Sequence, residues 1–297
     1  MGNTSPKSLA VAGLLFNAFV WGVCWWPFKQ LEAQGLHPLW ATALVYAFVF
    51  VSIALWLWRS GQLLSWRGHP GLWLLLLASG LTNVGFNWAV TVGDVVRAVL
   101  LFYLMPAWSV LVAWPVLGER PSRGSLLRLL LALAGVVIVL KSPDSPWPVP
   151  QGAADWLALG GGVFFAITNV LLRKLGHTPS EGRMVAMFGG GALMGMAAGA
   201  LGMAAGVVPA PALASAGWPV AAGLCLAFLL SNLGLQYGAA RLAAHTTSLV
   251  MLTELLFASV SSALLDAAEF STRTLVGGAL IVLAAMLAAL SGPEDRH

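Results

Sequence analysis

Long apolar runs, separated by short polar breaks, follow one another along nearly the whole chain. A helix needs about 20 apolar residues to cross the hydrocarbon core of a bilayer. Ten stretches approach this length, although the fifth and sixth are shorter than the rest. The pattern therefore predicts an all-α integral membrane protein with ten transmembrane helices, at residues 9–28, 39–58, 72–92, 95–117, 126–140, 156–172, 184–206, 218–238, 243–265 and 275–290.

Composition and charge agree with a membrane location. Hydrophobic residues make up 59% of the chain and charged residues only 9%, against about 25% charged in soluble domains. If the N-terminus is cytoplasmic, four of the 15 Lys and Arg residues are external and the other eleven are cytoplasmic, which satisfies the positive-inside rule. We therefore expect a multi-pass protein of the inner (cytoplasmic) membrane, surrounded by lipid, with both termini in the cytoplasm. The net charge of +4 follows from this topology and indicates no nucleic-acid partner.

A ten-residue segment occurs twice. LTNVGFNWAV at residues 81–90 returns as LSNLGLQYGA at residues 230–239. Each copy places two amide side chains four residues apart, on one face of a helix. The paired amides are Asn83 with Asn87 and Asn232 with Gln236.

This repetition predicts two five-helix repeats, at residues 1–140 and 153–297, joined by a Pro-rich connector at 141–152. The first spans of the two repeats can be aligned at an offset of 145, which pairs Phe19 with Phe164. Because each repeat has an odd number of spans, the second enters the membrane from the opposite face. Inverted repeats of this kind are typical of secondary transporters, whose substrate site lies near mid-membrane between the halves.

Three segments carry a family resemblance. WGVCWWPFK at 21–29, LFYLMPAWSVLVAWPVLGERPS at 101–122 and LVGGALIVLAA at 275–285 resemble the EamA-type branch of the drug/metabolite transporter superfamily. The resemblance covers essentially the whole chain. It implies ten helices in two inverted halves, a central cavity, and export of amino acids, other small metabolites or drugs. On overall resemblance we favour the YddG-like amino-acid exporters. Glu254 is followed by Leu255 where the family often has proline.

The candidate substrate site combines amides with aromatic rings. Amides both donate and accept hydrogen bonds, so they can hold the ammonium and carboxylate groups of a zwitterion; alternatively they only join helices. Aromatic rings suit apolar or aromatic side chains, although many tryptophans belong to interfacial belts. The predicted substrate-binding residues are Asn83, Asn87, Asn232, Gln236, Trp21, Trp25, Tyr103, Tyr237, Asn169 and Thr246.

Few ionisable residues fall inside the spans. Glu254 lies near the middle of the ninth, where a carboxylate costs roughly 3 kcal/mol on insertion scales and indicates a functional role by default. It is a candidate proton carrier or partner of a substrate amine, and a purely structural role is the alternative. Asp94 and Arg97 are three residues apart at the start of the fourth span, and we expect them to pair at the external rim.

Glycine and proline predict how the helices pack and bend. Gly191, Gly195 and Gly199 recur every fourth residue, which favours close helix packing. Pro27, Pro106 and Pro115 should interrupt the first and fourth spans. The sequence contains no Walker-type nucleotide motif, so a gradient and not ATP should drive transport. We expect transport to occur by alternating access.

The predicted function is a secondary transporter that exports small metabolites, with amino acids, including aromatic or other apolar ones, favoured as substrates. We expect no cofactor, no metal site and no disulfide, because Cys24 and Cys225 lie singly inside spans. A drug exporter of the same superfamily is one alternative. A multipass membrane enzyme is another, but HExxH, GxSxG and paired mid-span aspartates are absent from the sequence. The oligomeric state is left open.

Overall fold

The computed structural model describes residues 6–61, 69–118, 122–141, 149–212, 214–239, 250–251, 253–267 and 271–290. Within these residues all regular elements are helical and no strand occurs. The elements are α1 (Pro6–Val23), α2 (Trp25–Ala33), α3 (Pro38–Arg59), α4 (Gly71–Val92), α5 (Val95–Phe102), α6 (Met105–Leu117), α7 (Arg123–Leu140), α8 (Ala153–Lys174), α9 (Ser180–Ala204), the short 3-10 helix η1 (Ser215–Gly217), α10 (Trp218–Ala239), α12 (Thr253–Leu264) and α13 (Thr272–Leu290).

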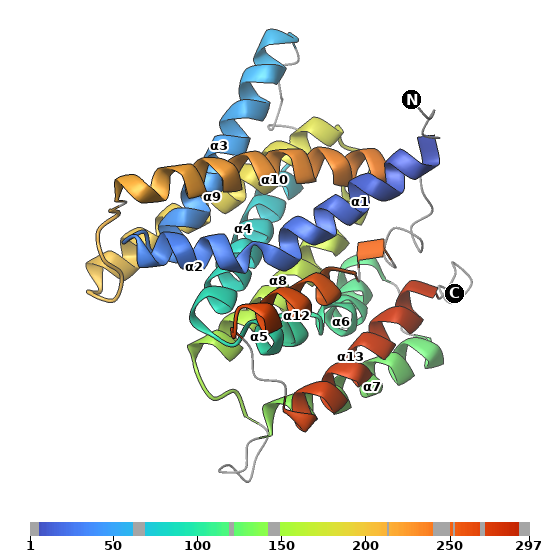
Figure 1. The fold of residues 1–297 in the computed structure, drawn as a ribbon. Helices are drawn as coiled ribbons and strands as arrows, with labels where there is room; N and C mark the ends of the chain where they lie inside the picture. Colours follow the sequence, from blue (N-terminus) through green and yellow to red (C-terminus); the bar gives the residue numbers. More distant parts are fainter. Residues whose placement is uncertain are drawn as a thin grey trace.

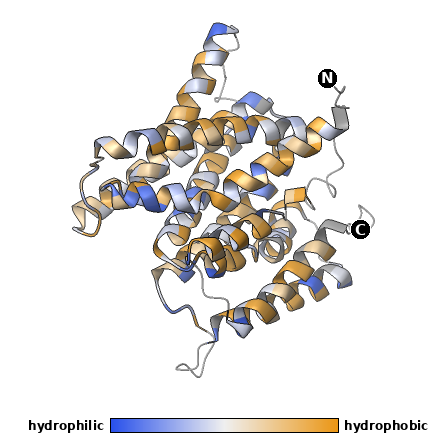
Figure 2. Ribbon diagram, viewed as in Figure 1, coloured by the Kyte–Doolittle hydropathy of each residue, from blue (hydrophilic) through white to orange (hydrophobic). Residues whose placement is uncertain are grey.

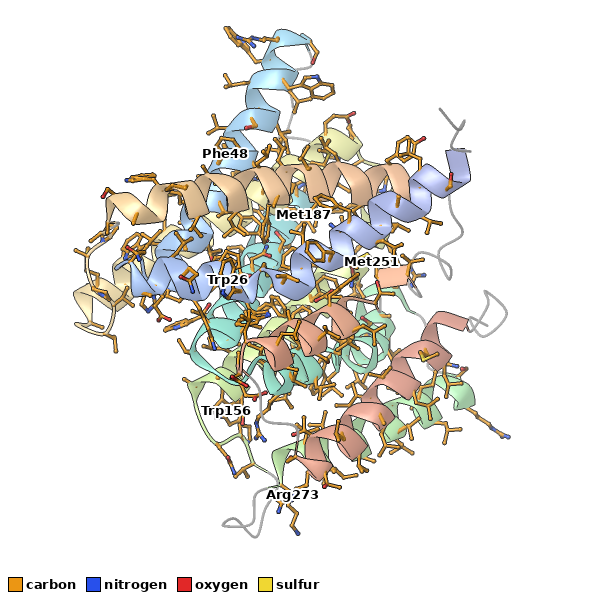
Figure 3. The ribbon with its side chains drawn as sticks, viewed as in Figure 1. Trp26, Phe48, Trp156, Met187, Met251 and Arg273 are labelled. Atoms are coloured by element: carbon orange, nitrogen blue, oxygen red, sulfur yellow. The ribbon has the colours of Figure 1, made fainter. Side chains whose placement is uncertain are left out.

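Nine of the predicted spans coincide with a helix or with two consecutive helices, and α12 lies within the ninth. Seven such segments are long and apolar enough to cross a membrane, and three shorter apolar helices lie within α7, α12 and α13. Only the first part of the predicted ninth span lies outside the described residues. Apolar residues cover the helices on most sides, while hydrophilic residues gather toward helix ends and loops (Figure 2). Large apolar side chains such as Trp26, Phe48 and Trp156 are exposed on the outside of the bundle (Figure 3).

Two spans are broken where the sequence places proline. The first is interrupted at Cys24, between α1 and α2, and the fourth at Tyr103 and Leu104, between α5 and α6. Proline has no N–H for the carbonyl four residues earlier, and its ring clashes with that carbonyl, so Pro27 and Pro106 account for both breaks. Pro115, by contrast, lies inside α6 without ending it.

The helices of the two sequence halves pack between one another. α4 lies against both α8 and α9, α1 packs along α10 and α12, and α3 crosses α9. α7 and α13 pair side by side at the lower edge of the bundle (Figure 1). Among the described helices, the most extensive contacts all join a helix before residue 141 to one after residue 152. The core is therefore formed jointly by both halves.

Glycine permits several of these helices to approach backbone to backbone. A Cβ atom on Gly13 would lie 2.8 Å from the carbonyl oxygen of Gly234, closer than real Cβ contacts. In membrane bundles such small residues let helices gain van der Waals contact at short range. Four glycine pairs cross in this way among the described residues: Gly13 with Gly234, Gly80 with Gly190, Gly85 with Gly161, and Gly135 with Gly277.

The glycine stripe predicted on α9 also packs closely, against α3. Gly191 faces the ring of Tyr46, Gly195 the backbone of Ala43, and Gly199 the ring of Trp40. The packing interpretation of this stripe is therefore confirmed.

Gly190→Ala should destabilise the protein. The added methyl group would meet the carbonyl oxygen of Leu76 on α4, and overpacking of this kind typically costs about 1–3 kcal/mol. Gly160→Ala on α8 is the matched control, because nothing lies within 4 Å of its Cβ position. Unfolding in detergent, followed by circular dichroism, measures both variants. Equal stability of the two would contradict the crossing of α4 and α9.

Candidate functional site

A series of aromatic rings runs through the core and involves five helices. The ring of Tyr46 on α3 contacts Phe228 on α10, with centroids 5.7 Å apart, and Phe228 contacts Trp21 on α1 at 5.0 Å. Trp21 continues to Phe86 on α4 at 5.9 Å. Phe86 meets Phe102 on α5 at 4.6 Å, and Tyr103 follows at 6.4 Å. We call these six residues the aromatic chain.

One end of the aromatic chain is an amide. The buried hydroxyl of Tyr46 donates to Oδ1 of Asn83, and Nδ2 of Asn83 donates to the carbonyl oxygen of Ser79 at 2.8 Å. The Tyr46 ring also contacts Phe188 on α9, in space that Gly191 leaves free. Asn83 is thus buried, and both its oxygen and its nitrogen are hydrogen-bonded.

The other end of the aromatic chain is a carboxylate. The hydroxyl of Tyr103 donates to Oε2 of Glu254 at 3.1 Å. Tyr103 lies at the break between α5 and α6, and Glu254 lies in the first turn of α12. Gly22 of α1 packs against the backbone of Glu254 and Ala258, so α1 contacts α12 at this residue.

Trp25 joins α2 to α12 further along the same helix as Glu254. Its indole Nε1 donates to Oγ of Ser261 at 3.0 Å. The ammonium group of Lys29 lies 5.4 Å from the centroid of the same ring, which is within the range of a cation–π interaction.

Two further buried amides join helices and each keeps an unused acceptor. Asn87 donates to Oγ1 of Thr42 at 3.1 Å, and Asn17 donates to Oγ of Ser231 at 2.6 Å. The Oδ1 atoms of both asparagines have no hydrogen-bond partner. An unsatisfied buried acceptor costs about 1–3 kcal/mol.

The structure unites part of the predicted site. Asn83, Trp21, Tyr103 and Glu254 belong to the aromatic chain or its two polar ends, while Trp25 binds Ser261 on α12. Asn87 is buried, but it points to α3. Three predicted residues, Asn232, Asn169 and Tyr237, are half-buried. The side chain of Gln236 and the whole of Thr246 lie outside the described residues.

The sequence did not reveal several residues of the aromatic chain, or two residues that contact the rings of Tyr46 and Trp25. Tyr46, Phe86, Phe188, Phe228 and Ser261 were not among the predicted residues. Phe86 could have been found, because it stands inside the repeated segment. Tyr46 is one of only three tyrosines and lies in mid-span, which is an uncommon depth for a phenol.

Comparison with known proteins agrees with this architecture. Residues 8–141 match the EamA-like transporter family. The uncharacterized transporter YojE of Bacillus subtilis (strain 168) is 31% identical over 137 residues, which cover 42% of this chain and 46% of YojE. The protein RarD of Escherichia coli (strain K12) is 23% identical over 56% of this chain and 55% of RarD. RarD of Streptomyces exfoliatus is 28% identical over 55% of this chain and 52% of its own length.

These matches span only about half the length of the relatives. One solved crystal structure shares the fold more completely, with a TM-score of 0.59 and 18% identity over 95% of this chain and 97% of that chain. The apolar helices indicate a multi-pass membrane protein, and the EamA-like match shows that its residues 8–141 are similar to a transporter family.

An ion pair joins the EamA-like N-terminal segment to α8. Arg97 donates from Nε and Nη2 to the two carboxylate oxygens of Asp155, each at 2.8 Å, and from Nη1 to the carbonyl oxygen of Val139 at 2.6 Å. This corrects the expected pairing of Arg97 with Asp94. Asp94 instead caps α5, because its side chain accepts the backbone N–H of Arg97 at 2.7 Å, while the guanidinium group extends toward α8.

Breaking this ion pair should destabilise the helix bundle. The side chains of Arg97 and Asp155 are only 22% and 7% exposed, so removal of one partner leaves a poorly solvated charge. We expect Arg97→Gln and Asp155→Asn each to cost about 1–3 kcal/mol, and the double variant to cost less than their sum. Thermal unfolding in detergent of the wild-type protein, the two single variants and the double variant measures this double-mutant cycle.

Arg273→Gln is the control for this cycle. Arg273 lies at the start of α13 (Figure 3), is exposed, and donates to the carbonyl oxygen of Lys141 at 3.0 Å. Its loss should cost less than about 0.5 kcal/mol. Strictly additive costs for Arg97 and Asp155 would argue against their coupling.

Proposed function

We propose that the whole chain is an EamA-type secondary transporter of the inner (cytoplasmic) membrane. Its ten helices form two inverted five-helix repeats around a central substrate cavity, with both termini in the cytoplasm. It exports small metabolites by alternating access, and amino acids with aromatic or other apolar side chains are the favoured substrates.

The pairing of helices supports an inverted repeat. If each helix is exchanged for its counterpart in the other half, the contacts of α4 with α8 and α9 become those of α10 with α1 and α3. The contact of α5 and α6 with α8 becomes that of α12 with α1. The pairs α7 with α13, α3 with α9 and α5 with α12 exchange into themselves. Such a pattern is expected when two equivalent halves are related by a two-fold axis.

The repeated segment supports the same relation in detail. Gly85 in its first copy crosses Gly161, and Gly234 in its second copy crosses Gly13. Gly85 and Gly234 occupy the same position of the repeated segment, and each lies at the crossing of its helix with the first span of the other half. By this correspondence Gly13 is the counterpart of Gly161, which aligns the first spans at an offset of 148 in place of the 145 expected from sequence.

One observation supports the proposed substrate class. The aromatic chain is built by both halves and has hydrogen-bonding groups, Asn83 and Glu254, at its ends. Small-molecule sites typically combine apolar and aromatic walls with a few placed polar groups. An amino acid with an apolar side chain has the matching chemistry, because its polar groups are few and its remaining surface is hydrophobic.

Counterflow in proteoliposomes tests this function. The labelled probes are L-phenylalanine, a nucleoside and a cationic drug, and we expect L-phenylalanine to exchange fastest. Asn83→Ala should slow its exchange about tenfold, since one lost hydrogen bond of about 1–1.5 kcal/mol corresponds to this factor. Thr82→Ala is the control, because Thr82 only donates to the carbonyl oxygen of Ala78 in its own helix and should change the rate less than about twofold.

Several outcomes would contradict the proposal. A folded Asn83→Ala variant with wild-type exchange would exclude Asn83 from the site. Preferred exchange of the nucleoside or the drug would favour another substrate class of the superfamily. Turnover of added lipids or peptides, without exchange of any solute, would favour the membrane-enzyme alternative.

A further inference from the structure

We propose that α5 is the external gate of the transporter, a short helix that swings at the α5–α6 break and is latched shut by the ion pair of Arg97 with Asp155. This inference rests on the proposed transport function and topology. It adds the segment that closes the outer side and the conformation in which the protein rests, which is closed to the outside.

The burial of α5 distinguishes it from the other half of its own span. Seven of its eight residues are buried, and Arg97 is the exception. A span beside lipid exposes at least one face, so α5 is enclosed by protein, chiefly by α4, α8 and α12. By contrast, α6, which completes the span, exposes Leu111 and Trp114 on the outside of the bundle. α5 therefore fills the interior of the bundle, and α6 lies at its edge.

The helix α5 connects the outer rim to the aromatic chain. In the proposed topology its first residue, Val95, lies at the external surface, and its last, Phe102, belongs to the aromatic chain. The ring of Phe102 contacts Phe165 on α8, with centroids 5.4 Å apart. A Cβ atom on Gly162 of α8 would lie 2.8 Å from the carbonyl oxygen of Phe102. Packing of α5 on α8 thus separates the aromatic chain from the outside.

The latch at the rim joins three helices. The guanidinium group of Arg97 donates to both carboxylate oxygens of Asp155 on α8 and to the carbonyl oxygen of Val139 on α7. Asp155 also accepts the backbone N–H of Gln151 at 2.9 Å. Because the carboxylate is only 7% exposed, it is poorly solvated without its partner. The ion pair therefore favours the conformation in which α5 is packed on α8.

The latch has no charged equivalent in the other half of the sequence. The offset of 148 between the first spans relates Asp155 to Lys7. The repeated segment, which starts at 81 and again at 230, gives an offset of 149 and relates Arg97 to Thr246. Thr246 lies outside the described residues, but a threonine carries no charge and cannot pair ionically with a lysine. Since inverted halves exchange roles between the two conformations, an ion pair at the external rim favours the conformation that is closed there.

The hinge of the gate is the break that proline imposes. Pro106 has no N–H, so the carbonyl group of Phe102 lacks its helical partner. Tyr103 and Leu104 lie between α5 and α6, and the N–H of Leu104 donates to the carbonyl oxygen of Leu101 at 3.3 Å, in a tighter turn than that of an α-helix. Rotation at these two residues moves α5 as a unit and leaves α6 intact.

Reversible crosslinking tests whether α5 must leave α8 during transport. Arg97→Cys and Asp155→Cys are combined in a chain that also carries Cys24→Ala and Cys225→Ala, and a short bis-methanethiosulfonate joins the two new thiols. The readout is counterflow of labelled L-phenylalanine in proteoliposomes, with the same protein before crosslinking as the reference. We expect the crosslink to abolish counterflow, because a locked gate cannot alternate, and reduction with dithiothreitol to restore it.

A second crosslink on the same rim is the matched control. Lys141→Cys and Arg273→Cys replace residues at the end of α7 and the start of α13, where Arg273 donates to the carbonyl oxygen of Lys141 at 3.0 Å. These helices cross at Gly135 and Gly277 and correspond to each other in the two halves, so their contact persists in both conformations. This crosslink should change the rate less than about twofold. Undiminished counterflow with the crosslink between α5 and α8, or equal loss with both crosslinks, would overturn the gate.

Arg97→Gln tests the resting conformation. The apparent affinity on one side of the membrane rises with the fraction of molecules open to that side. Without the latch the outward-open fraction increases, so the half-saturating concentration of L-phenylalanine at the external face should fall at least about threefold, and the value at the cytoplasmic face should not fall. Uptake by right-side-out and inside-out membrane vesicles measures both values.

Arg273→Gln, which lies on the same rim, is the control for this measurement. It should leave the ratio of the two half-saturating concentrations within about twofold of the wild-type ratio. A folded Arg97→Gln variant with the wild-type ratio would overturn the latch, because loss of stability alone does not favour one face.

The outcomes distinguish the gate from the function on which it rests. Wild-type counterflow that persists through the crosslink between α5 and α8 would retain the transporter and refute the gate alone. Absence of wild-type counterflow for every probe would refute the transport function and the gate with it.

Discussion

Close backbone contact between helices of different sequence halves is the constraint on which the other features depend. In a lipid environment the hydrophobic effect does little to bring helices together, so packing at short range must do so. The glycine pairs Gly13–Gly234, Gly85–Gly161 and Gly135–Gly277 provide this contact. They bring α1 to α10, α4 to α8 and α7 to α13 at distances that no larger residue permits.

This packing explains how the aromatic rings of the core come into contact. Trp21 and Phe228 touch because α1 and α10 cross closely, and Trp21 reaches Phe86 on α4. The aromatic chain then separates two hydrogen-bonded pairs, Tyr46 with Asn83 and Tyr103 with Glu254. A core of this kind places few polar atoms in an apolar bundle, and the polar groups at both ends of the aromatic chain are hydrogen-bonded within the protein.

The sequence predicted the positions of the helices better than the contacts between them. The spans could be predicted because the thickness of the bilayer fixes their length, and the two breaks because proline removes a backbone donor. Asn83 and Glu254 stood out as polar groups in apolar runs. Tyr46, Phe228 and Ser261 did not, because their importance comes from contacts across helices far apart in sequence.

One error has a local physical cause. The spacing of Asp94 and Arg97 suggested a side-chain pair, but the start of a helix has unsatisfied N–H groups, and Asp94 satisfies one of them. The offset of 145 between the first spans stays a prediction, and the proposed correspondence of Gly13 with Gly161 would change it to 148.

The pairing of early helices with late ones also bears on how the protein is made. α4 is complete at Val92, yet the helices against which it packs begin only at Ala153 and Ser180. Helices α1 to α7 are therefore synthesised before α8 to α13, with which their most extensive contacts form. These contacts can form only after the ribosome has delivered the later part of the chain.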